Sequence, residues 1–229
     1  ILKKKCKMSL KGINKQYHLG RDSGSQKYNK LNTSKTYSNA ILIGSVSFIC
    51  FYIIAAIIYP YSFNPLNNFF CDLTPASFGC ENTSNPAFFP SLLTILSMSI
   101  VLAFFFFSFA NQSSESLLSK RLIKFFGSIS SFCTFCIGIY DLHDQALILA
   151  IATGIIPMAI ITSTILKNRK RYFPILGLIT CSLLTFYVSI FYLEFSEPIW
   201  PIMQKITIIL SLIWINLIVL KNKSTSSLF

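Results

Sequence analysis

Six long apolar runs constrain this chain more than any other feature of its sequence. They cover approximately residues 40–59, 91–110, 122–140, 146–166, 173–193 and 202–220. Each run is close to the ~20 residues that an α-helix needs to cross a ~30 Å hydrocarbon core. A helix satisfies its own backbone hydrogen bonds in lipid, whereas a β-barrel is built from shorter, alternating segments. We therefore predict an all-α membrane protein with a six-transmembrane-helix bundle.

The composition agrees with a membrane protein rather than a soluble one. Charged residues make up 12% of the chain and hydrophobic residues 53%, whereas soluble domains carry about 25% charged residues. The net charge of +12 does not indicate a nucleic-acid surface, because half of the 20 basic residues lie in residues 1–40 and most others flank apolar runs. That distribution is typical of an orientation signal. We expect the lipid bilayer, and no nucleic acid, as the partner.

The charges of the connecting segments predict the orientation. If the N-terminus is cytoplasmic, the inner connections and both termini carry Lys and Arg, and the outer connections carry none. Six of the eight acids fall in the outer connections: Asp72, Glu81, Asp141, Asp144, Glu194 and Glu197. Because Lys and Arg bias in short loops sets topology, we predict an N-in/C-in, multi-pass protein of the plasma (inner) membrane.

Three regions follow from this topology. Residues 1–39 form a basic arm without sustained periodicity, which we expect to be disordered and cytoplasmic. This arm could bind anionic lipid headgroups at about 1 kcal/mol per charge. Residues 40–220 form the transmembrane domain, and residues 221–229 form a short cytoplasmic tail.

The first outer connection, residues 59–90, is the best candidate for a functional site. It is long, it contains no Lys or Arg, and it carries Asn68, Asp72 and Asn85. Such residues suit an outer-facing pocket in which asparagines orient a lipid headgroup or small polar ligand and an acid holds a cation. A disulfide between Cys71 and Cys80 and a pair of free thiols both remain open for this segment.

The turn between the third and fourth runs supplies a second group of polar residues, Asp141, His143 and Asp144. Carboxylates beside an imidazole could bind a divalent metal or move a proton, and a tight hydrophilic turn also favours these residues for structural reasons alone. A metal here would need His143 and Asp144 together with Asp72 of the first loop. No motif requires a cofactor.

Lys205 is the one charge well inside an apolar run. A lone cation in hydrocarbon costs about 2.5–3.5 kcal/mol on insertion scales. Its side chain can extend to the outer interface near Glu197, or it can pair with an acid of an outer-facing cavity. The candidate partners in such a cavity are Asp72, Asp141 and Asp144.

The first outer loop resembles that of the DUF998 family of bacterial and archaeal integral membrane proteins. In that family a Tyr-Pro leaves the first helix, an Asn-x-x-Ser-Asp-Leu-Gly type motif follows, and an Asn-Pro precedes the second helix. The matching residues here are Tyr59 and Pro60, then Asn68, Asp72 and Leu73, then Asn85 and Pro86, with Asp141 and His143 in the next outer turn. Cys71 stands in place of the serine and Thr74 in place of the glycine. The resemblance, and a weaker one to six-helix Frag1/DRAM/Sfk1-type proteins, implies a fold and a site location but no reaction.

Three functions remain open on the sequence alone. The first is an outer-facing pocket that binds a lipid headgroup or small polar ligand. The second is a membrane-embedded, metal-dependent hydrolase that uses His143 and the acids Asp72, Asp141 and Asp144. The third is a small transporter with Lys205 as its buried charge.

Overall fold

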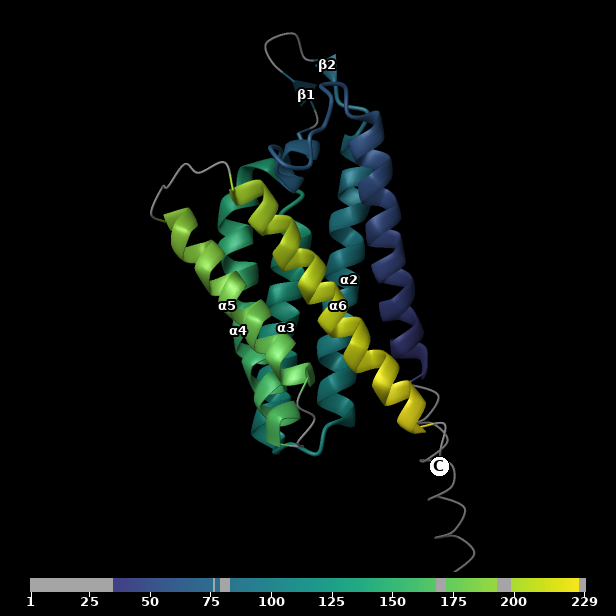
Figure 1. Cartoon of the computed structure of the whole chain (residues 1–229), viewed down its shortest axis with the longest axis vertical. Helices are drawn as coiled ribbons and strands as arrows, with labels where there is room; N and C mark the ends of the chain where they lie inside the picture. The colour runs from purple at the N-terminus through teal and green to yellow at the C-terminus, as the bar shows by residue number, and fades with distance from the viewer. Residues whose placement is uncertain (1–34, 76, 79–82, 168–171, 193–198, 227–229) are drawn as a thin grey trace, which may run out of the picture. The chain divides into compact units, whose positions relative to one another are not determined.

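The computed structural model describes residues 35–75, 77–78, 83–167, 172–192 and 199–226. The chain divides into two compact units, Ile1–Thr36 and Tyr37–Phe229, and the second holds the helical bundle (Figure 1). Six long helices make up the bundle: an N-terminal helix Lys35–Ile58, α2 Phe88–Gln112, α3 Leu117–Cys136, α4 His143–Lys167, α5 Tyr172–Tyr192 and α6 Trp200–Ser226. The predicted basic arm and the acids Glu81, Glu194 and Glu197 lie outside the described residues.

The connections contain short elements of their own. The loop after the N-terminal helix holds the 3-10 turn η1, Phe70–Leu73, and the strands β1, Ser77–Phe78, and β2, Thr83–Ser84. The two strands pair antiparallel, with Ser77 opposite Ser84. A second 3-10 turn, η2, Tyr140–Leu142, leads directly into α4.

The prediction of a helical protein is confirmed, because each of the six predicted runs corresponds to one helix. Four of these helices are long and apolar enough to cross a membrane: Lys35–Ile58, Phe88–Gln112, His143–Lys167 and Trp200–Lys221. The third helix is less apolar because its first eight residues include Lys120, Arg121 and Lys124. It ends at Cys136 rather than at the predicted Tyr140. The described apolar part of α5 is the shorter stretch Pro174–Ser189.

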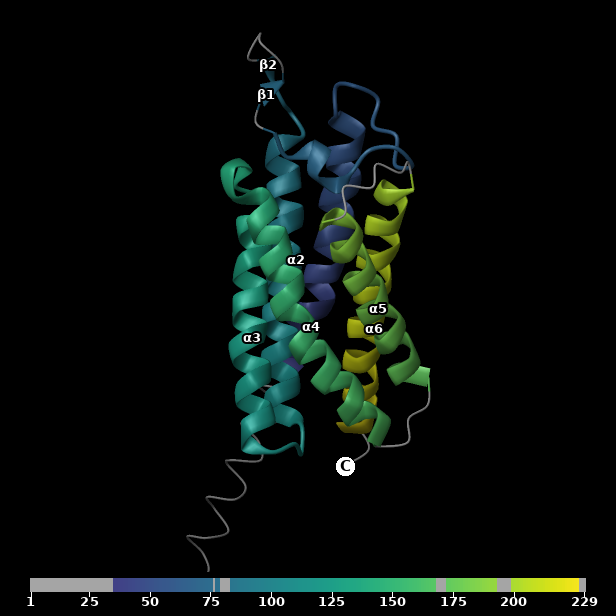
Figure 2. The ribbon, with the colours of Figure 1, turned by 90° about the vertical axis from the view of Figure 1, so that its left-hand side faces the viewer.

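The helices pack in a ring. α3 packs against α2 and α4, and α5 packs against α4 and α6 (Figures 1 and 2). The N-terminal helix closes the ring between α2 and α6. Its Gly44 approaches α2 so closely that an added Cβ would lie 2.7 Å from Cγ2 of Val101. On its other side, Nδ2 of Asn216 in α6 donates to Oγ of Ser45 at 2.9 Å.

Small residues let the backbones approach. A Cβ at Gly127 of α3 would lie 2.7 Å from three atoms of Phe106 in α2. Between α3 and α4, the hydroxyl of Ser130 donates to the carbonyl oxygen of Ala150 at 2.7 Å, and it also fills the space above Gly154. Close contacts through small residues and hydroxyl bonds between helices are the usual packing of helices in lipid.

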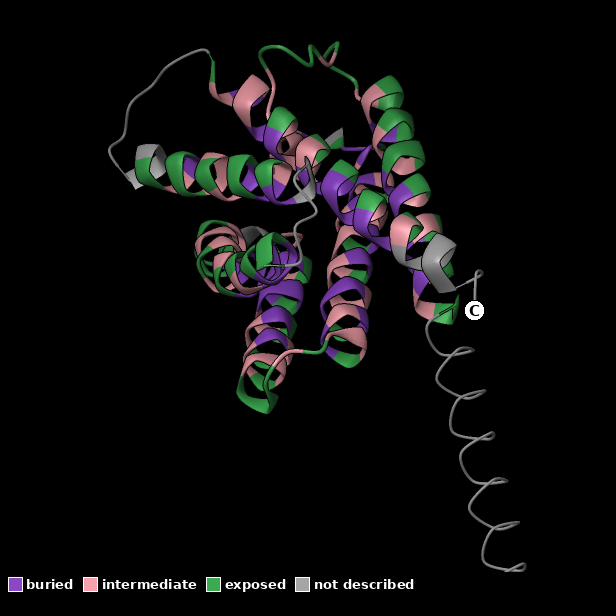
Figure 3. Ribbon diagram, turned by 60° about the horizontal axis from the view of Figure 1, so that its bottom comes forward, coloured by how far each residue is buried: buried purple, intermediate pink, exposed green. Residues whose placement is uncertain are grey.

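The outer faces of the helices carry large apolar side chains. Ile43, Ile57 and Phe132 are 66%, 75% and 67% exposed, whereas Trp214 and Phe105 are fully buried between the helices. Figure 3 shows the exposed faces pointing outward and the buried faces inward. Contiguous apolar surface of this kind is rare on monomeric soluble proteins, and it gives the bundle a membrane-like character.

The two ends of the bundle differ in their charge. The first loop with η1, the turn η2 and the start of α6 lie together at one end (Figures 1 and 2). This end, called the loop end below, carries Asp72, Asp141 and Asp144. The basic residues at the start of α3 and Lys167 at the end of α4 lie at the opposite end.

Candidate functional site

The carboxylate of Asp72 stabilises the conformation of the first loop by accepting two hydrogen bonds from it. Its Oδ2 accepts hydrogen bonds from the backbone nitrogen of Phe69 at 2.8 Å and from Nδ2 of Asn68 at 3.2 Å. Asn68 in turn accepts a bond at Oδ1 from the backbone nitrogen of Asn64 at 2.9 Å. The two predicted site residues Asn68 and Asp72 therefore lie together, and their polar atoms shape the loop.

Aromatic side chains fix this loop to the N-terminal helix. The ring of Tyr52 in this helix lies with its centroid 4.1 Å from that of Phe70 and 6.0 Å from that of Phe63. The ring of Tyr59, one residue after the helix, lies 5.9 Å from that of Phe63. Burial, assisted by the nearby carboxylate of Asp72, raises the pKa of the Tyr59 phenol above its ordinary value. The phenol is therefore neutral at physiological pH, which suits a packed aromatic cluster.

Lys205 joins the loop to α6 through backbone carbonyls. Its Nζ donates to the carbonyl oxygen of Asn68, and at 3.0 Å to that of Pro201. The same Nζ lies 5.8 Å from the centre of the Phe63 ring, a cation–π distance. Within the described part of the chain Lys205 forms no ion pair with an acid, so the predicted pairing with Asp72, Asp141 or Asp144 is absent there. Its role in this arrangement is to anchor the loop.

Asn85 stabilises the part of the first loop that precedes α2. Its Nδ2 donates to the carbonyl oxygens of Leu73, at 3.0 Å, and Pro75, at 2.7 Å, and its Oδ1 accepts from the nitrogen of Ala87 at 2.9 Å. Asn85 is buried, and both ends of its amide are engaged by the loop backbone. The structure therefore gives this predicted pocket residue a structural role.

Only part of the second predicted group of residues comes together in the structure. Asp141 is exposed in η2 and is not brought to the other site residues by any contact within the described residues. His143 and Asp144 do come together, with Nδ1 of the imidazole 2.8 Å from Oδ1 of the carboxylate. The other ring nitrogen of His143, Nε2, is buried and has no hydrogen-bond partner among the described residues.

Cys71 is the residue of the first loop that meets His143. Its thiol lies beside the imidazole and interacts with it. Leu147, one helical turn after His143, lines the same cavity as Cys71. No bond joins Asp72 to His143 in the described part of the chain. The contact with His143 is made by Cys71, one residue before Asp72. Cys71 is a free thiol, and Cys80, its predicted disulfide partner, lies outside the described residues.

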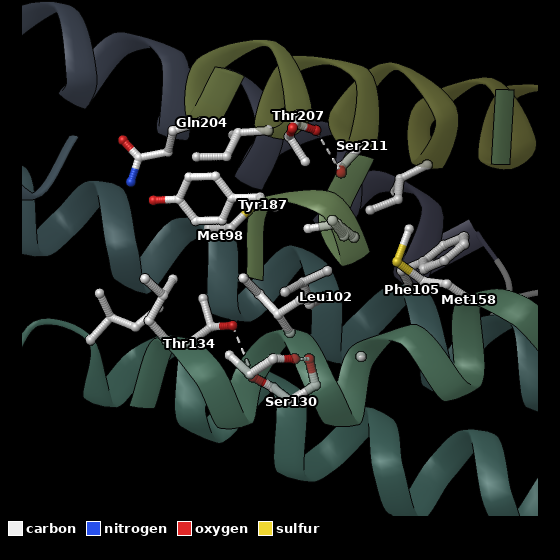
Figure 4. Close-up of a pocket in the computed structure, with 18 of the residues that line it drawn as sticks. Met98, Leu102, Phe105, Ser130, Thr134, Met158, Tyr187, Gln204, Thr207 and Ser211 are labelled. Carbon is white, nitrogen blue, oxygen red and sulfur yellow. Dashed lines mark hydrogen bonds between the residues drawn. The ribbon is translucent and has the colours of Figure 1, made fainter. Parts of the chain in front are cut away.

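Gln204 of α6 completes this group. Its Oε1 accepts from the backbone nitrogen of Phe70 at 2.8 Å, and its Nε2 lies 3.6 Å from Sγ of Cys71. The phenol of Tyr187 in α5 points toward the Gln204 side chain (Figure 4). Neither residue is among the site residues that the sequence predicts. The available signal for Gln204 is an amide side chain in an otherwise apolar run.

An apolar cavity adjoins this polar group. One cavity of about 150 Å³ lies among α2, α3, α4, α5 and α6, and Tyr187 and Gln204 are part of its wall (Figure 4). A second, of about 100 Å³, is lined by Cys71 and Thr74 of the first loop. The two share Gln204 and Ile208 among their lining residues, so they adjoin. Most of their walls consist of aliphatic and aromatic side chains.

The predicted metal candidates do not assemble into a metal centre in the described residues. No group of three or more His, Cys, Asp and Glu side chains is placed to hold an ion there. Protein zinc sites usually have three or four such ligands, and His143 with Asp144 supplies two. The geometry therefore favours a thiol, imidazole and amide cluster above an apolar cavity.

Comparisons with protein-family models, with curated proteins and with solved structures found no match to this chain.

Proposed function

We propose that this protein is a six-pass integral membrane protein, N-in/C-in in the plasma (inner) membrane, whose outer-facing pocket binds a lipid. The ligand places its polar headgroup at the loop end and part of its apolar chain between the helices. The observation that carries this proposal is the pair of adjoining apolar cavities that begins directly beneath Cys71 and Gln204.

The shape and lining of the cavity support a chain-bearing ligand over a wholly polar one. Ligand pockets are typically apolar with a few placed polar groups, and here the polar groups gather at one end. A dry cavity of ~150 Å³ in another protein holds a benzene-sized molecule. The cavity of about 150 Å³ here therefore suits a segment of an acyl chain rather than a whole lipid tail.

The distribution of charge along the bundle supports the proposed topology. The described basic residues at the ends of α3 and α4 lie opposite the acids of the loop end, as the positive-inside rule requires. The test uses two exposed serines, Ser84→Cys in the first loop and Ser114→Cys between α2 and α3. A membrane-impermeant maleimide should add label over the native background to the Ser84→Cys protein in intact cells. It should add label to Ser114→Cys only after permeabilisation. The reverse pattern would overturn the topology.

A cavity-filling variant tests the binding site. Ser211 lines the cavity, and its hydroxyl donates only within α6, to the carbonyl oxygen of Thr207 at 2.7 Å. Ser211→Leu therefore fills the cavity without breaking a bond between helices. Ile209→Leu, on the exposed face of the same helix, is the matched control.

The readout is stabilisation by an added ligand. A short-chain phosphatidylglycerol at 100 times its Kd should stabilise the wild type and Ile209→Leu by about 2.7 kcal/mol. Ser211→Leu should lose most of this effect. Glycerol phosphate, which is the headgroup without chains, should stabilise none of them. Equal stabilisation of all three proteins by the lipid, or none by the lipid, would refute the proposal.

A further inference from the structure

The side-chain amide of Gln204 has a defined orientation. Its Oε1 lies 2.8 Å from the backbone nitrogen of Phe70, and a backbone N–H can only donate a hydrogen bond. The carbonyl end of the amide must therefore face Phe70. The NH₂ end then faces Cys71, with Nε2 3.6 Å from Sγ. An N–H donor is thus held beside the thiol by a bond to the same 3-10 turn.

The imidazole of His143 is oriented by a comparable constraint. Nδ1 lies 2.8 Å from Oδ1 of Asp144, and an ionised carboxylate can only accept. Nδ1 therefore carries a ring proton, and Nε2 is the ring nitrogen that can exchange a proton with a neighbouring group. This Nε2 is buried without a hydrogen-bond partner among the described residues, and the neighbouring thiol is that of Cys71. Such bonds are often poorly aligned in a ligand-free site and tighten in the complex.

We propose that Cys71 is the nucleophile of an acyl-transfer site, with His143 as its general base and Gln204 as the donor to the oxyanion. Asp144 acts through His143, whose ring it orients. These four roles are those that thiol-dependent acyl transfer requires: an attacking sulfur, a base within reach, a group that orients the base, and an amide donor placed where charge develops.

The reaction hydrolyses a carboxylic ester in two steps. Sγ of Cys71 attacks the ester carbonyl carbon while Nε2 of His143 takes the thiol proton, and the carbonyl oxygen becomes an anion that accepts from Nε2 of Gln204. Collapse of this intermediate breaks the carbon–oxygen bond, and the leaving alcohol takes the proton from His143. Water, deprotonated by His143, then attacks the thioester. The carbon–sulfur bond breaks, His143 returns its proton to the sulfur, and the fatty acid leaves, so one ester and one water give one acid and one alcohol.

The cavity defines the substrate class. Cys71 and Gln204 line the cavity of about 100 Å³ that adjoins the larger one, so an acyl chain between the helices places its carbonyl carbon at the thiol. This inference rests on the proposed function, in which that space holds part of an acyl chain. The substrate is an ester of an apolar carboxylic acid that reaches the site from the outer half of the bilayer, where the alcohol and water can exchange.

The test traps the acyl-enzyme in the full chain. The purified protein, kept reduced in nanodiscs, is mixed with p-nitrophenyl octanoate and then digested for mass spectrometry. We expect an octanoyl group on Cys71 that neutral hydroxylamine removes. Cys50, Cys136 and Cys181, described free cysteines of the same chain, serve as internal controls and should stay unmodified.

Conservative variants separate catalysis from folding. Gln204→Glu keeps the acceptor for Phe70 and removes the N–H donor, so it should lower the acylation rate by about 10²–10³-fold, the usual effect of losing one oxyanion donor. His143→Gln should lower both acylation and deacylation by about 10²–10⁴-fold. Cys71→Ser should form no hydroxylamine-sensitive adduct. p-Nitrophenyl acetate, which cannot fill the cavity, should acylate Cys71 more slowly than the octanoyl ester.

The outcomes distinguish this inference from the proposed function. Lipid stabilisation of Cys71→Ser is measured in the same preparations. If lipid stabilises the protein but octanoyl is found on all cysteines alike, or its rate on Cys71 is unchanged in His143→Gln and Gln204→Glu, the catalytic role is refuted and the binding site stands. If lipid stabilises no variant and the wild type is also not stabilised, the binding site itself is refuted.

Discussion

Gly127→Ala is the substitution with the best-defined cost in this bundle. A Cβ at Gly127 would lie 2.7 Å from Cβ, Cγ and Cδ2 of Phe106 on α2. Rotation of the aromatic side chain cannot relieve the contact with Cβ, because that atom is fixed to the backbone. The two helices must therefore move apart.

The distance that the two helices must move apart determines how far the substitution lowers the free energy of unfolding. Ordinary van der Waals contact begins at 3.4 Å, so the α2 and α3 backbones must separate locally by about 0.7 Å, the difference between 3.4 and 2.7 Å. Overpacking of this kind costs about 1–3 kcal/mol, and the better helix propensity of alanine offsets up to about 1 kcal/mol. The net loss in the free energy of unfolding therefore spans about 0–3 kcal/mol, and we expect a value near the middle of this range, about 1–2 kcal/mol.

Gly154→Ala is the matched control. Its Cβ would also lie 2.7 Å from a neighbour, but that neighbour is the hydroxyl oxygen of Ser130, which can rotate away. Rotation breaks the bond to Ala150, and such bonds between membrane helices are worth about 0.6 kcal/mol on average. Alanine's propensity offsets this loss, so Gly154→Ala should be close to neutral.

The assay is equilibrium unfolding in mixed micelles, with the denaturing detergent varied and helicity followed by circular dichroism. Gly127→Ala should shift the unfolding constant by about tenfold, because 1.4 kcal/mol corresponds to a factor of ten. A Gly127→Ala protein as stable as the wild type, or a Gly154→Ala protein that is the less stable of the two, would refute the packing described for α2 and α3.

Two further predictions concern the first loop. Asn85→Ala should lower the free energy of unfolding by about 1–3 kcal/mol, because one buried and one partly buried carbonyl oxygen lose their donor. Asn67→Ala, at an exposed position of the same loop, should stay within about 0.5 kcal/mol. The same unfolding assay and proteolysis of the loop measure both. Lys205→Met keeps the apolar stem and removes the ammonium, so it should destabilise the protein by about 1.5–3 kcal/mol, the value of hydrogen bonds to a charged group. If Lys205→Met abolished ion flux in liposomes while stability was unchanged, the charge of Lys205 would be required for transport and its structural role would be refuted.

The helices could be predicted from the sequence because the signal is carried by long segments. Twenty consecutive apolar residues leave little choice of secondary structure in lipid, and each run became one helix. The end of α3 was predicted too late. Ile137 and Ile139 are as apolar as the helix before them, yet the chain turns at Gly138, which packs against Leu92 of α2. That contact depends on tertiary packing, which a hydropathy pattern does not contain.

The sequence indicated two polar segments but not which residues of them come into contact. The first loop meets the start of α4 through Cys71 and His143 rather than through Asp72. Successive residues of a 3-10 turn point about 120° apart, so neighbours in sequence face different surroundings, and the sequence does not indicate which one faces inward. The same holds for Gln204 and Lys205, which point about 100° apart on α6. In both pairs the charged residue is the one that the sequence pattern indicates, whereas the uncharged one lines the cavity.

The hydrogen bond between Ser45 and Asn216 spans 171 residues of sequence, and it has a consequence for biogenesis. The helix Lys35–Ile58 leaves the ribosome well before α6, so it acquires this neighbour only when α6 has been synthesised. The bond from Gln204 to Phe70 imposes the same delay on the first loop, across 134 residues. A nascent chain interrupted before α6 would therefore leave the helix Lys35–Ile58 without a neighbour on one side and Cys71 without the amide of Gln204. In such a truncated product the backbone nitrogen of Phe70 would lose its acceptor, whereas the Ser45 hydroxyl would keep its bond to the carbonyl oxygen of Ile41.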